Sequence, residues 1–306
     1  MTSDSVATGR TVDRSAPVGD TGAGQDARWR RLRKGDKKWT KKTTILFIVG
    51  VIIALIAIFP LVYMVLSSFK PEAEVYGESF LPKHWTFQNF IYVFTEVPFA
   101  RYMLNSFLVS AIVTVVALFF HSMAAYALAR LKFKGRETVF LIIFSTLLVS
   151  LPVVLIPEFV VVKTLGMLDS YWGLIVPSIF SAFGIFLLRQ FYMGLPDELE
   201  EAALIDGAGY WRIYWSVVLP LSRPILAALA VFFFLANWNS FIWPLTITSN
   251  PDLRVVQVGI STFHQQYASS ESYIIAASTV AAIPTLLLFF FFQKQITESI
   301  KTSGFK

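Results

Sequence analysis

Apolar residues fall into six long runs along the chain, separated by shorter polar segments. An α-helix needs about 20 apolar residues to cross a hydrocarbon core about 30 Å thick, and each run reaches that length. We therefore predict six transmembrane helices and an all-α fold, a polytopic membrane helical bundle. The predicted spans are Thr43 to Phe69, Tyr102 to Leu131, Thr138 to Val162, Tyr171 to Tyr192, Val217 to Ile247 and Tyr273 to Ile296.

Several of these spans contain proline. A proline kink is tolerated in a membrane where neighbouring helices or water satisfy the freed carbonyl groups, so the prolines favour a packed bundle around a cavity. They are Pro152 and Pro157 in the third span, Pro177 in the fourth, Pro220, Pro224 and Pro244 at the two ends of the fifth, and Pro284 in the sixth.

Composition agrees with a membrane protein. Of 306 residues, 55% are hydrophobic and 15% are charged, and the mean hydropathy is +0.61, whereas about a quarter of the residues in a soluble domain are charged. The chain has no cysteine, which excludes disulfides, thiol nucleophiles and thiolate metal sites. Its three histidines do not have the spacing of a metal site, and no metal site is predicted.

The distribution of basic residues orients the predicted bundle. With the N-terminus inside, 21 of the 26 Lys and Arg residues lie in cytoplasmic segments. By the positive-inside rule, both termini are cytoplasmic, and the basic residues serve orientation and do not indicate a nucleic-acid partner. We predict a disordered basic cytoplasmic tail over residues 1–42, a six-span domain over 43–298 and a cytoplasmic C-terminal tail over 299–306.

One cytoplasmic segment, between the fourth and fifth spans, is acidic. Pro196 or Asp197 suits the start of a short helix there, and Gly207 or Gly209 suits its end. The functional interpretation is a helix that docks on a cytoplasmic partner with a basic groove; the alternative is a solvated surface helix. Its five carboxylates fall within ten residues: Asp197, Glu198, Glu200, Glu201 and Asp206.

A longer pattern favours docking. It reads Glu201-Ala202-Ala203, three residues, Gly207, nine residues, Val217, one residue and Leu219-Pro220. This resembles the EAA loop of ABC importer permeases, the inner-membrane components of bacterial binding-protein-dependent transport systems, with Val217 in place of the family's Ile. Further stretches resemble the carbohydrate branch and its maltose-type, MalG-like subunit: Asn105-Ser106-Phe107, Ala124 to Arg130, Trp238 to Phe241 with Pro244-Leu245, and Ser303 to Lys306.

The resemblance implies a MetI-like permease fold that forms half of a translocation pathway in the cell membrane. The segment of about residues 196–209 would be the coupling helix, seated in a cleft of an ATPase. The implied partners are a second homologous permease in a heterodimer, a cytoplasmic ABC ATPase dimer, an extracytoplasmic sugar-binding protein and the lipid bilayer. The implied coupling residues are Glu201, Ala202, Ala203, Asp206, Gly207, Leu219 and Pro220.

The chain contains no Gly-x-x-x-x-Gly-Lys-Ser/Thr motif. We therefore predict that it is not an enzyme and binds no cofactor, and that ATP and Mg are bound by the partner ATPase.

Polar residues inside a span are candidates for a solute pathway. In the fifth span these are Asn237, Trp238, Asn239, Ser240 and Trp243. Amides can hydrogen-bond sugar hydroxyls and indoles can stack on a pyranose ring; the alternative is interhelical hydrogen bonding with an interfacial aromatic belt. Maltose, maltodextrin, trehalose and other oligosaccharides are compatible solutes.

Two alternative functions are compatible with a polytopic membrane protein. A secondary transporter, not driven by ATP, would be expected to show internal repeats and buried charges, and a docking helix would have no role in it. An ABC importer permease for a non-sugar solute is the second alternative.

Overall fold

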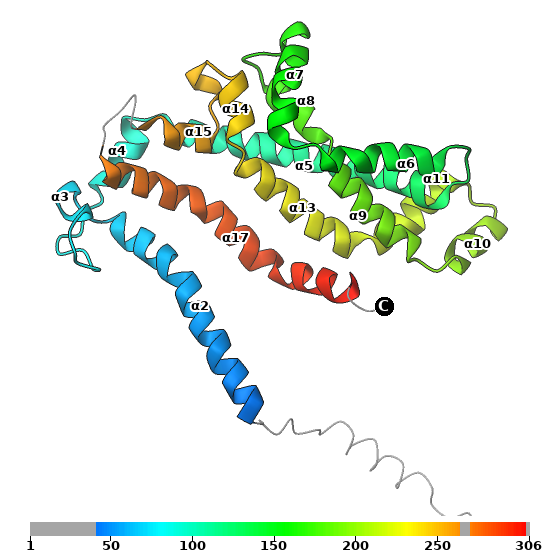
Figure 1. The fold of residues 1–306 in the computed structure, drawn as a ribbon, viewed down its shortest axis with the longest axis horizontal. Coiled ribbons are helices and arrows are strands. Elements are labelled where there is room, and N and C mark those ends of the chain that lie inside the picture. Colours follow the sequence, from blue (N-terminus) through cyan, green and yellow to red (C-terminus); the bar gives the residue numbers. More distant parts are fainter. Residues whose placement is uncertain (1–40, 264–269, 304–306) are drawn as a thin grey trace, which may run out of the picture. The chain divides into compact units, whose positions relative to one another are not determined.

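The computed structural model describes residues 41–263 and 270–303 (Figure 1), with the backbone alone for residues 41 and 294–303. The chain divides into two compact units, residues 1–59 and 60–306. In the first, the described residues belong to the apolar helix α2 (Lys41–Ser67). The predicted N-terminal tail lies outside the described residues except for residues 41 and 42, which already belong to α2.

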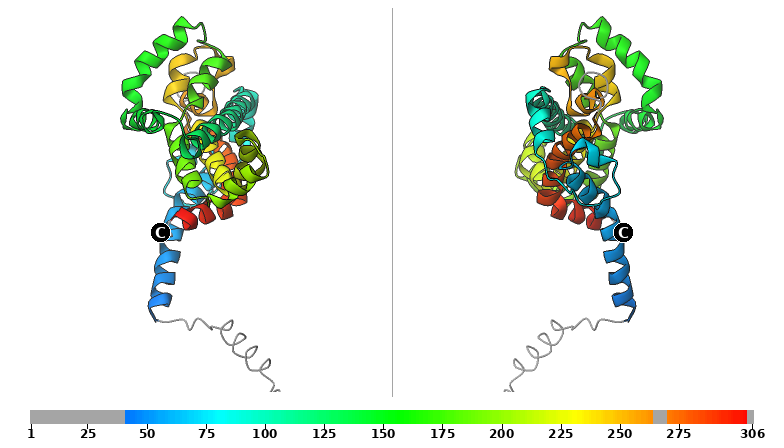
Figure 2. Two further views of the ribbon diagram at one scale, coloured as in Figure 1. Left: turned by 90° about the vertical axis from the view of Figure 1, so that its right-hand side faces the viewer. Right: turned by 90° about the vertical axis from the view of Figure 1, so that its left-hand side faces the viewer.

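Within the described residues, four helical segments are long and apolar enough to cross a membrane: Lys42–Ser67, Phe99–Arg130, Tyr171–Met193 and Glu271–Gln293. Two bent pairs also qualify, namely Arg136–Leu148 with Leu151–Thr164, which bends by 107°, and Tyr210–Leu221 with Arg223–Trp238, which bends by 75°. If each pair is one span, they complete the six predicted spans. Figure 2 shows the first bend from two sides, where α7 turns away from α6.

The second unit consists of helices and short connections. The spans and half-spans are α5 (Phe99–Arg130), α6 (Arg136–Ser145), α7 (Leu151–Thr164), α8 (Tyr171–Ile179), α9 (Ala182–Met193), α13 (Arg223–Trp238) and α17 (Glu271–Ser303). The short elements are α3 (Glu72–Val75), α4 (Gln88–Thr95), η1 (Thr146–Leu148), α10 (Glu198–Ile205), α11 (Tyr210–Ile213), η2 (Tyr214–Val218), α12 (Leu219–Leu221), α14 (Ile242–Ile247), η3 (Pro251–Leu253) and α15 (Val256–Ser261).

The fifth span differs from the predicted 217–247: as a bent pair it runs from Tyr210 to Trp238, and so begins and ends earlier. Helix α13 ends at Trp238, and α14 begins only at Ile242. The side chains of Asn237 and Asn239 donate to carbonyl groups four residues earlier, at 2.8 Å each. Asn side chains compete in this way with regular helix geometry, so the helix ends between them.

The last helix, α17, extends beyond the predicted sixth span: the part apolar enough to cross a membrane is Glu271–Gln293, close to the predicted Tyr273 to Ile296. The helix itself continues to Ser303, so the described part of the predicted C-terminal tail, 299–303, is helical. Between Ile296 and Ser303 the sequence has neither glycine nor proline to end the helix; Gly304, the first such residue, lies outside the described residues.

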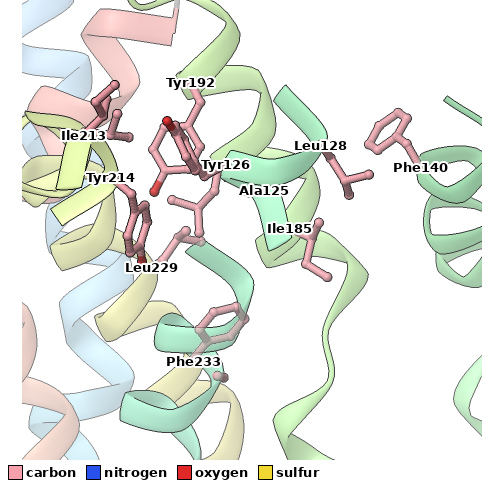
Figure 3. Packing of buried hydrophobic residues seen from close by; sticks show 13 residues of the cluster. Ala125, Tyr126, Leu128, Phe140, Ile185, Tyr192, Ile213, Tyr214, Leu229 and Phe233 are labelled. Atoms are coloured by element: carbon pink, nitrogen blue, oxygen red, sulfur yellow. The ribbon is translucent and has the colours of Figure 1, made fainter. Parts of the chain in front are cut away.

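Helix α5 lies at the centre of the second unit because it contributes to each of three buried apolar clusters. Ala125 belongs to the cluster with α9, α11 and α13 (Figure 3), Tyr102 to the cluster with α4, α13, α15 and α17, and Val113 to the cluster with α7, α8, α14 and α15. At Gly259 a Cβ would lie 2.3 Å from the Tyr102 ring. Only glycine therefore lets α15 approach α5 this closely.

Buried polar groups fasten α5 to the connection between α14 and α15. The amide of Asn105 donates to the carbonyls of Asp252 and Arg254, both at 2.9 Å, and accepts from the Tyr171 hydroxyl at 2.7 Å. The Ser106 hydroxyl accepts from the Val256 amide at 2.7 Å. These polar residues of α5 thus serve packing between segments about 150 residues apart.

Candidate functional site

The acidic connection between α9 and α11 contains the predicted short helix, and α10 projects at the end of the second unit where α5 ends (Figure 1). Gly207 has a φ of +76°, a conformation that favours glycine. Its N–H donates to the Leu204 carbonyl at 3.0 Å, and the Ala208 N–H donates to the Ala203 carbonyl at 2.9 Å. These two bonds form a Schellman motif, so of the two predicted end residues, Gly207 and Gly209, it is Gly207 that ends the helix.

The start of α10 differs from the expected side-chain cap. Asp197 precedes the helix but makes no capping hydrogen bond with its side chain. Its carboxylate instead accepts from the guanidinium of Arg130, the last residue of α5, and Arg130 also donates to the Leu195 carbonyl. A third partner, Glu200, has Oε1 at 3.3 Å from Arg130 Nε, an ion pair without hydrogen-bond geometry.

The five carboxylates therefore divide into two groups. Asp197 and Glu200 face Arg130, whose side chain is only 8% exposed. Burial raises the pKa of Glu200 and nearby Asp197 raises it further, while Arg130 lowers it. The remaining carboxylates, on exposed residues that can meet another protein, are those of Glu198, Glu201 and Asp206.

Most of the predicted coupling residues are accessible. Ala203 and Leu219 are half-buried and pack on the cluster around α5 and α9. Ile205, which the motif does not include, has 87% of its surface exposed at the tip of α10. The structure thus presents an acidic helix with an apolar tip. The exposed coupling residues are Glu201, Ala202, Asp206, Gly207 and Pro220.

An irregular helix joins this loop to the fifth span. Residues Tyr214–Val218 form a π-helix, η2, and the chain bends before α13. π-helical turns are rare and are frequent at functional sites. The Tyr214 hydroxyl shares a buried hydrogen bond of 2.6 Å with the Ser122 hydroxyl of α5. Figure 3 shows Tyr214 beside Tyr126 and Tyr192.

The two tryptophans proposed for the solute pathway are buried within the chain. Trp243 donates its indole N–H to the Gly173 carbonyl of α8 at 3.1 Å, and Trp238 donates to the Ala281 carbonyl of α17 at 3.1 Å. Pro177 has no N–H for the Gly173 carbonyl four residues earlier, and Trp243 supplies the missing donor. This geometry favours the alternative interpretation, interhelical hydrogen bonding, for both tryptophans.

The polar residues next to these tryptophans differ from them in exposure. Asn239 is exposed, while Asn237 and Ser240 are half-buried. Asn239 accepts from Gln257 Nε2 at 3.3 Å, and both residues line an open hollow of about 360 Å³ whose other walls include Ser278 and Thr285 of α17. Of the five proposed residues, only Asn239 lines this hollow.

Arg130 and the Arg189–Glu137 pair have structural roles that the sequence pattern does not indicate. Arg189 donates to both carboxylate oxygens of Glu137, at 2.7 and 2.9 Å, and lies over the Phe140 ring at 3.8 Å. Basic residues at the ends of spans that are predicted to be cytoplasmic indicate orientation and not a partner. Their individual partners depend on tertiary contacts between different spans.

Comparison with known proteins gives consistent matches. The family model described as "Binding-protein-dependent transport system inner membrane component" matches residues 33–302. The arabinooligosaccharides transport system permease protein AraQ of Halalkalibacterium halodurans is 36% identical over 229 residues, 73% of this chain and 82% of the relative. The sn-glycerol-3-phosphate transport system permease protein UgpE of Yersinia pestis is 38% identical over 224 residues, 71% of this chain and 79% of the relative.

Solved structures give the same fold. A chain in the crystal structure of a bacterial ABC transporter involved in the import of the acidic polysaccharide alginate matches with a TM-score of 0.73 and 26% identity, over 83% of this chain and 98% of that chain. In a structure of bacterial alginate ABC transporter in complex with alginate pentasaccharide-bound periplasmic protein, a chain matches with a TM-score of 0.59 and 18% identity, over 84% of this chain and 96% of that chain.

Proposed function

We propose that this chain, which belongs to the family of binding-protein-dependent transport system inner membrane components, forms half of the translocation pathway of an ATP-driven importer for oligosaccharides. The family and the relatives are transport permeases, so the predictions of a MetI-like membrane permease and of a protein that is not an enzyme are confirmed. The solute, the coupling residues and the individual partners belong to the proposal.

The observation that carries the coupling role is the geometry of α10. Its first turn is fixed by Arg130 and its end by the Schellman motif at Gly207, while Glu198 and Glu201 are exposed. A short helix held at both ends, with exposed carboxylates and the apolar tip at Ile205, fits a groove with basic rims and an apolar floor. We assign that groove to a cytoplasmic ATPase dimer, which binds ATP and Mg.

The proposal places α10 and both termini in the cytoplasm. The positive-inside asymmetry supports this, because the ends of the spans near α10 include Arg130, Arg136, Arg189 and Arg212, whereas few basic residues lie at the other ends. A second homologous permease would complete the pathway, and the family description supports an extracytoplasmic binding protein that delivers the solute.

The solute class rests on two supports. The relatives named above include an arabinooligosaccharide system, and the alginate importer at 26% identity handles a polysaccharide by its description. The hollow beside Asn239 and Gln257 offers uncharged amides and hydroxyls, which suit the hydroxyls of a neutral sugar. Maltose, maltodextrin and trehalose stay within this class.

A glycerol-phosphate relative favours the second candidate, a permease for a non-sugar solute. A phosphate group is usually bound by Arg or Lys. The residues around the hollow provide neither, so we place this candidate second.

Reconstitution tests the proposal. The chain, purified with its partner permease and ATPase, is placed in proteoliposomes with the binding protein, and labelled oligosaccharide uptake is measured with and without ATP. Uptake that needs ATP and the ATPase is expected. Uptake by the chain alone without ATP would establish a secondary transporter instead.

Replacement of the exposed docking residues tests the site. Glu201→Lys should reduce the amount of ATPase that co-purifies with the chain, because it reverses a charge at the proposed interface. Glu72→Lys on α3 is the matched control, because it makes the same change on the opposite side of the predicted membrane. Equal ATPase recovery from both variants would argue against docking through α10.

A further inference from the structure

Helix α5 holds the acidic loop at the loop's beginning. The Arg130 guanidinium donates to the Asp197 carboxylate and to the Leu195 carbonyl, and Glu200 completes the set. Arginine suits this place because its planar fork can serve several acceptors at once, which a lysine ammonium on its flexible stem does less well. The Arg130 and Glu200 side chains are nearly buried, so this ion pair is screened little by water, whereas the Asp197 carboxylate is largely exposed.

Helix α5 also holds the loop's end. Two turns before Arg130, the Ser122 hydroxyl is bonded to the Tyr214 hydroxyl in a buried contact. The ring centroid of Tyr126, between these two positions on α5, lies 5.4 Å from that of Tyr214. Segment 195–214 is therefore attached to α5 at both ends, with α10 between the attachments.

The connection from this loop to α13 is less direct. After Tyr214 come the π-helical turn, the short α12 and the 75° bend that precedes α13. π-turns and sharp bends are places where a helix interrupts its regular hydrogen-bonding ladder. Helix α10 is thus connected to α5 by direct side-chain contacts, but to α13 through a π-helical turn and a bend.

We propose that Arg130 is a positioning residue that makes α5 and α10 move as one body, so that a displacement of α10 by the ATPase passes first to α5. This inference rests on the proposed function. Since α5 contributes to all three buried clusters, its movement would reach the other spans of the second unit directly. Arg130 does not contact solute or nucleotide in this scheme.

The test measures ATP hydrolysis and solute uptake in the same proteoliposomes, with the complete importer. For Arg130→Ala we expect hydrolysis to continue while uptake per ATP falls at least about fivefold, the lower end of usual coupling between sites. Arg130→Lys should restore part of the ratio. Lys134→Ala, which removes a charge from an exposed position nearby, should leave the ratio unchanged.

A purely structural role for Arg130 would lower uptake and hydrolysis together, in proportion to the complex assembled. If Arg130→Ala does not assemble, Asp197→Arg answers the same question, because Asp197 has an 80% exposed side chain and the change sets two cations against each other. An unchanged uptake-to-ATP ratio in either assembled variant would overturn the proposal. Failure of the unaltered complex to take up solute with ATP would instead reject the proposed function.

Discussion

The hydrogen bond from Trp243 to the Gly173 carbonyl gives a prediction that can be worked through quantitatively. Pro177 cannot supply an N–H to this carbonyl, and the Trp243 indole donates to it at 3.1 Å in a buried position. Trp243→Phe keeps an aromatic ring but removes the donor, so the Gly173 carbonyl is left unpaired. In Pro177→Ala, the new N–H at position 177 can form the regular helical bond instead.

The expected free-energy cost of losing this hydrogen bond depends on its buried position inside a membrane protein. An unsatisfied buried polar group costs about 1–3 kcal/mol, but hydrogen bonds inside membrane proteins average about 0.6 kcal/mol and reach about 1.7 in double-mutant cycles. We therefore expect Trp243→Phe to cost about 1 kcal/mol more with Pro177 present than in the Pro177→Ala background. The loss of indole packing is common to both backgrounds and cancels in the cycle.

The assay is denaturation by sodium dodecyl sulfate in mixed micelles, followed by far-ultraviolet circular dichroism, for the four proteins of the cycle. Trp172→Phe serves as the matched control, because Trp172 is 67% exposed and should change stability by less than about 0.5 kcal/mol. If Trp243→Phe costs the same free energy in both backgrounds, Trp243 does not satisfy the carbonyl freed by Pro177.

Three further predictions concern the loops. Gly207→Ala should destabilise the end of α10 by about 1–2 kcal/mol and so speed amide hydrogen exchange at Ala208. The cost comes from the positive φ alone, because no neighbouring atom lies close to the new Cβ. Gly207→Asn should have a smaller effect, and equal exchange rates in the two variants would refute this reasoning. Asn105→Ala should lower the unfolding free energy by about 2–3 kcal/mol, because it removes the donor to two carbonyls of the connection between α14 and α15 and the acceptor of the Tyr171 hydroxyl; a denaturation midpoint like that of the unaltered chain would contradict it. The raised pKa of Glu200 means that its contribution to stability is present below its unfolded pKa and lost as pH rises through the folded pKa. As pH rises above about 4, the ordinary pKa of Glu, Glu200→Gln should therefore gain stability relative to the unaltered chain, and denaturation midpoints with the opposite trend would show that the Arg130 contact outweighs burial.

Those parts of the fold that depend on local pattern could be predicted from the sequence. Span number followed from the length of the apolar runs, and the end of α10 followed from Gly207, whose role is set within five residues. The break after Trp238 was missed because it depends on side-chain bonds from Asn237 and Asn239 to the backbone of their own helix. A hydropathy average over a span-length window is dominated by the apolar residues, so the predicted span continues through the two asparagines.

The direction in which a side chain faces could not be predicted in the same way. Asn239 and Trp238 are adjacent, yet Asn239 lines the hollow and Trp238 donates to α17. Pro177 was a usable signal, since a proline in a span requires a donor for its freed carbonyl and an indole N–H can provide one. Arg130 gave no local signal for its role, because its partners Leu195 and Asp197 lie 65 and 67 residues further along the chain.

The polar face of α5 has a consequence for how the chain is made. Asn105 and Ser106 are paired with residues that follow them by 147 to 150 positions, so α5 leaves the ribosome long before those partners exist. At about 5–20 residues per second, the wait is about 7–30 s. During biogenesis this helix must therefore stay at the insertion machinery, or in contact with water or a chaperone, until the later spans arrive. A stalled chain that ends before residue 252 should be recognised by membrane quality control even though its second span is already complete.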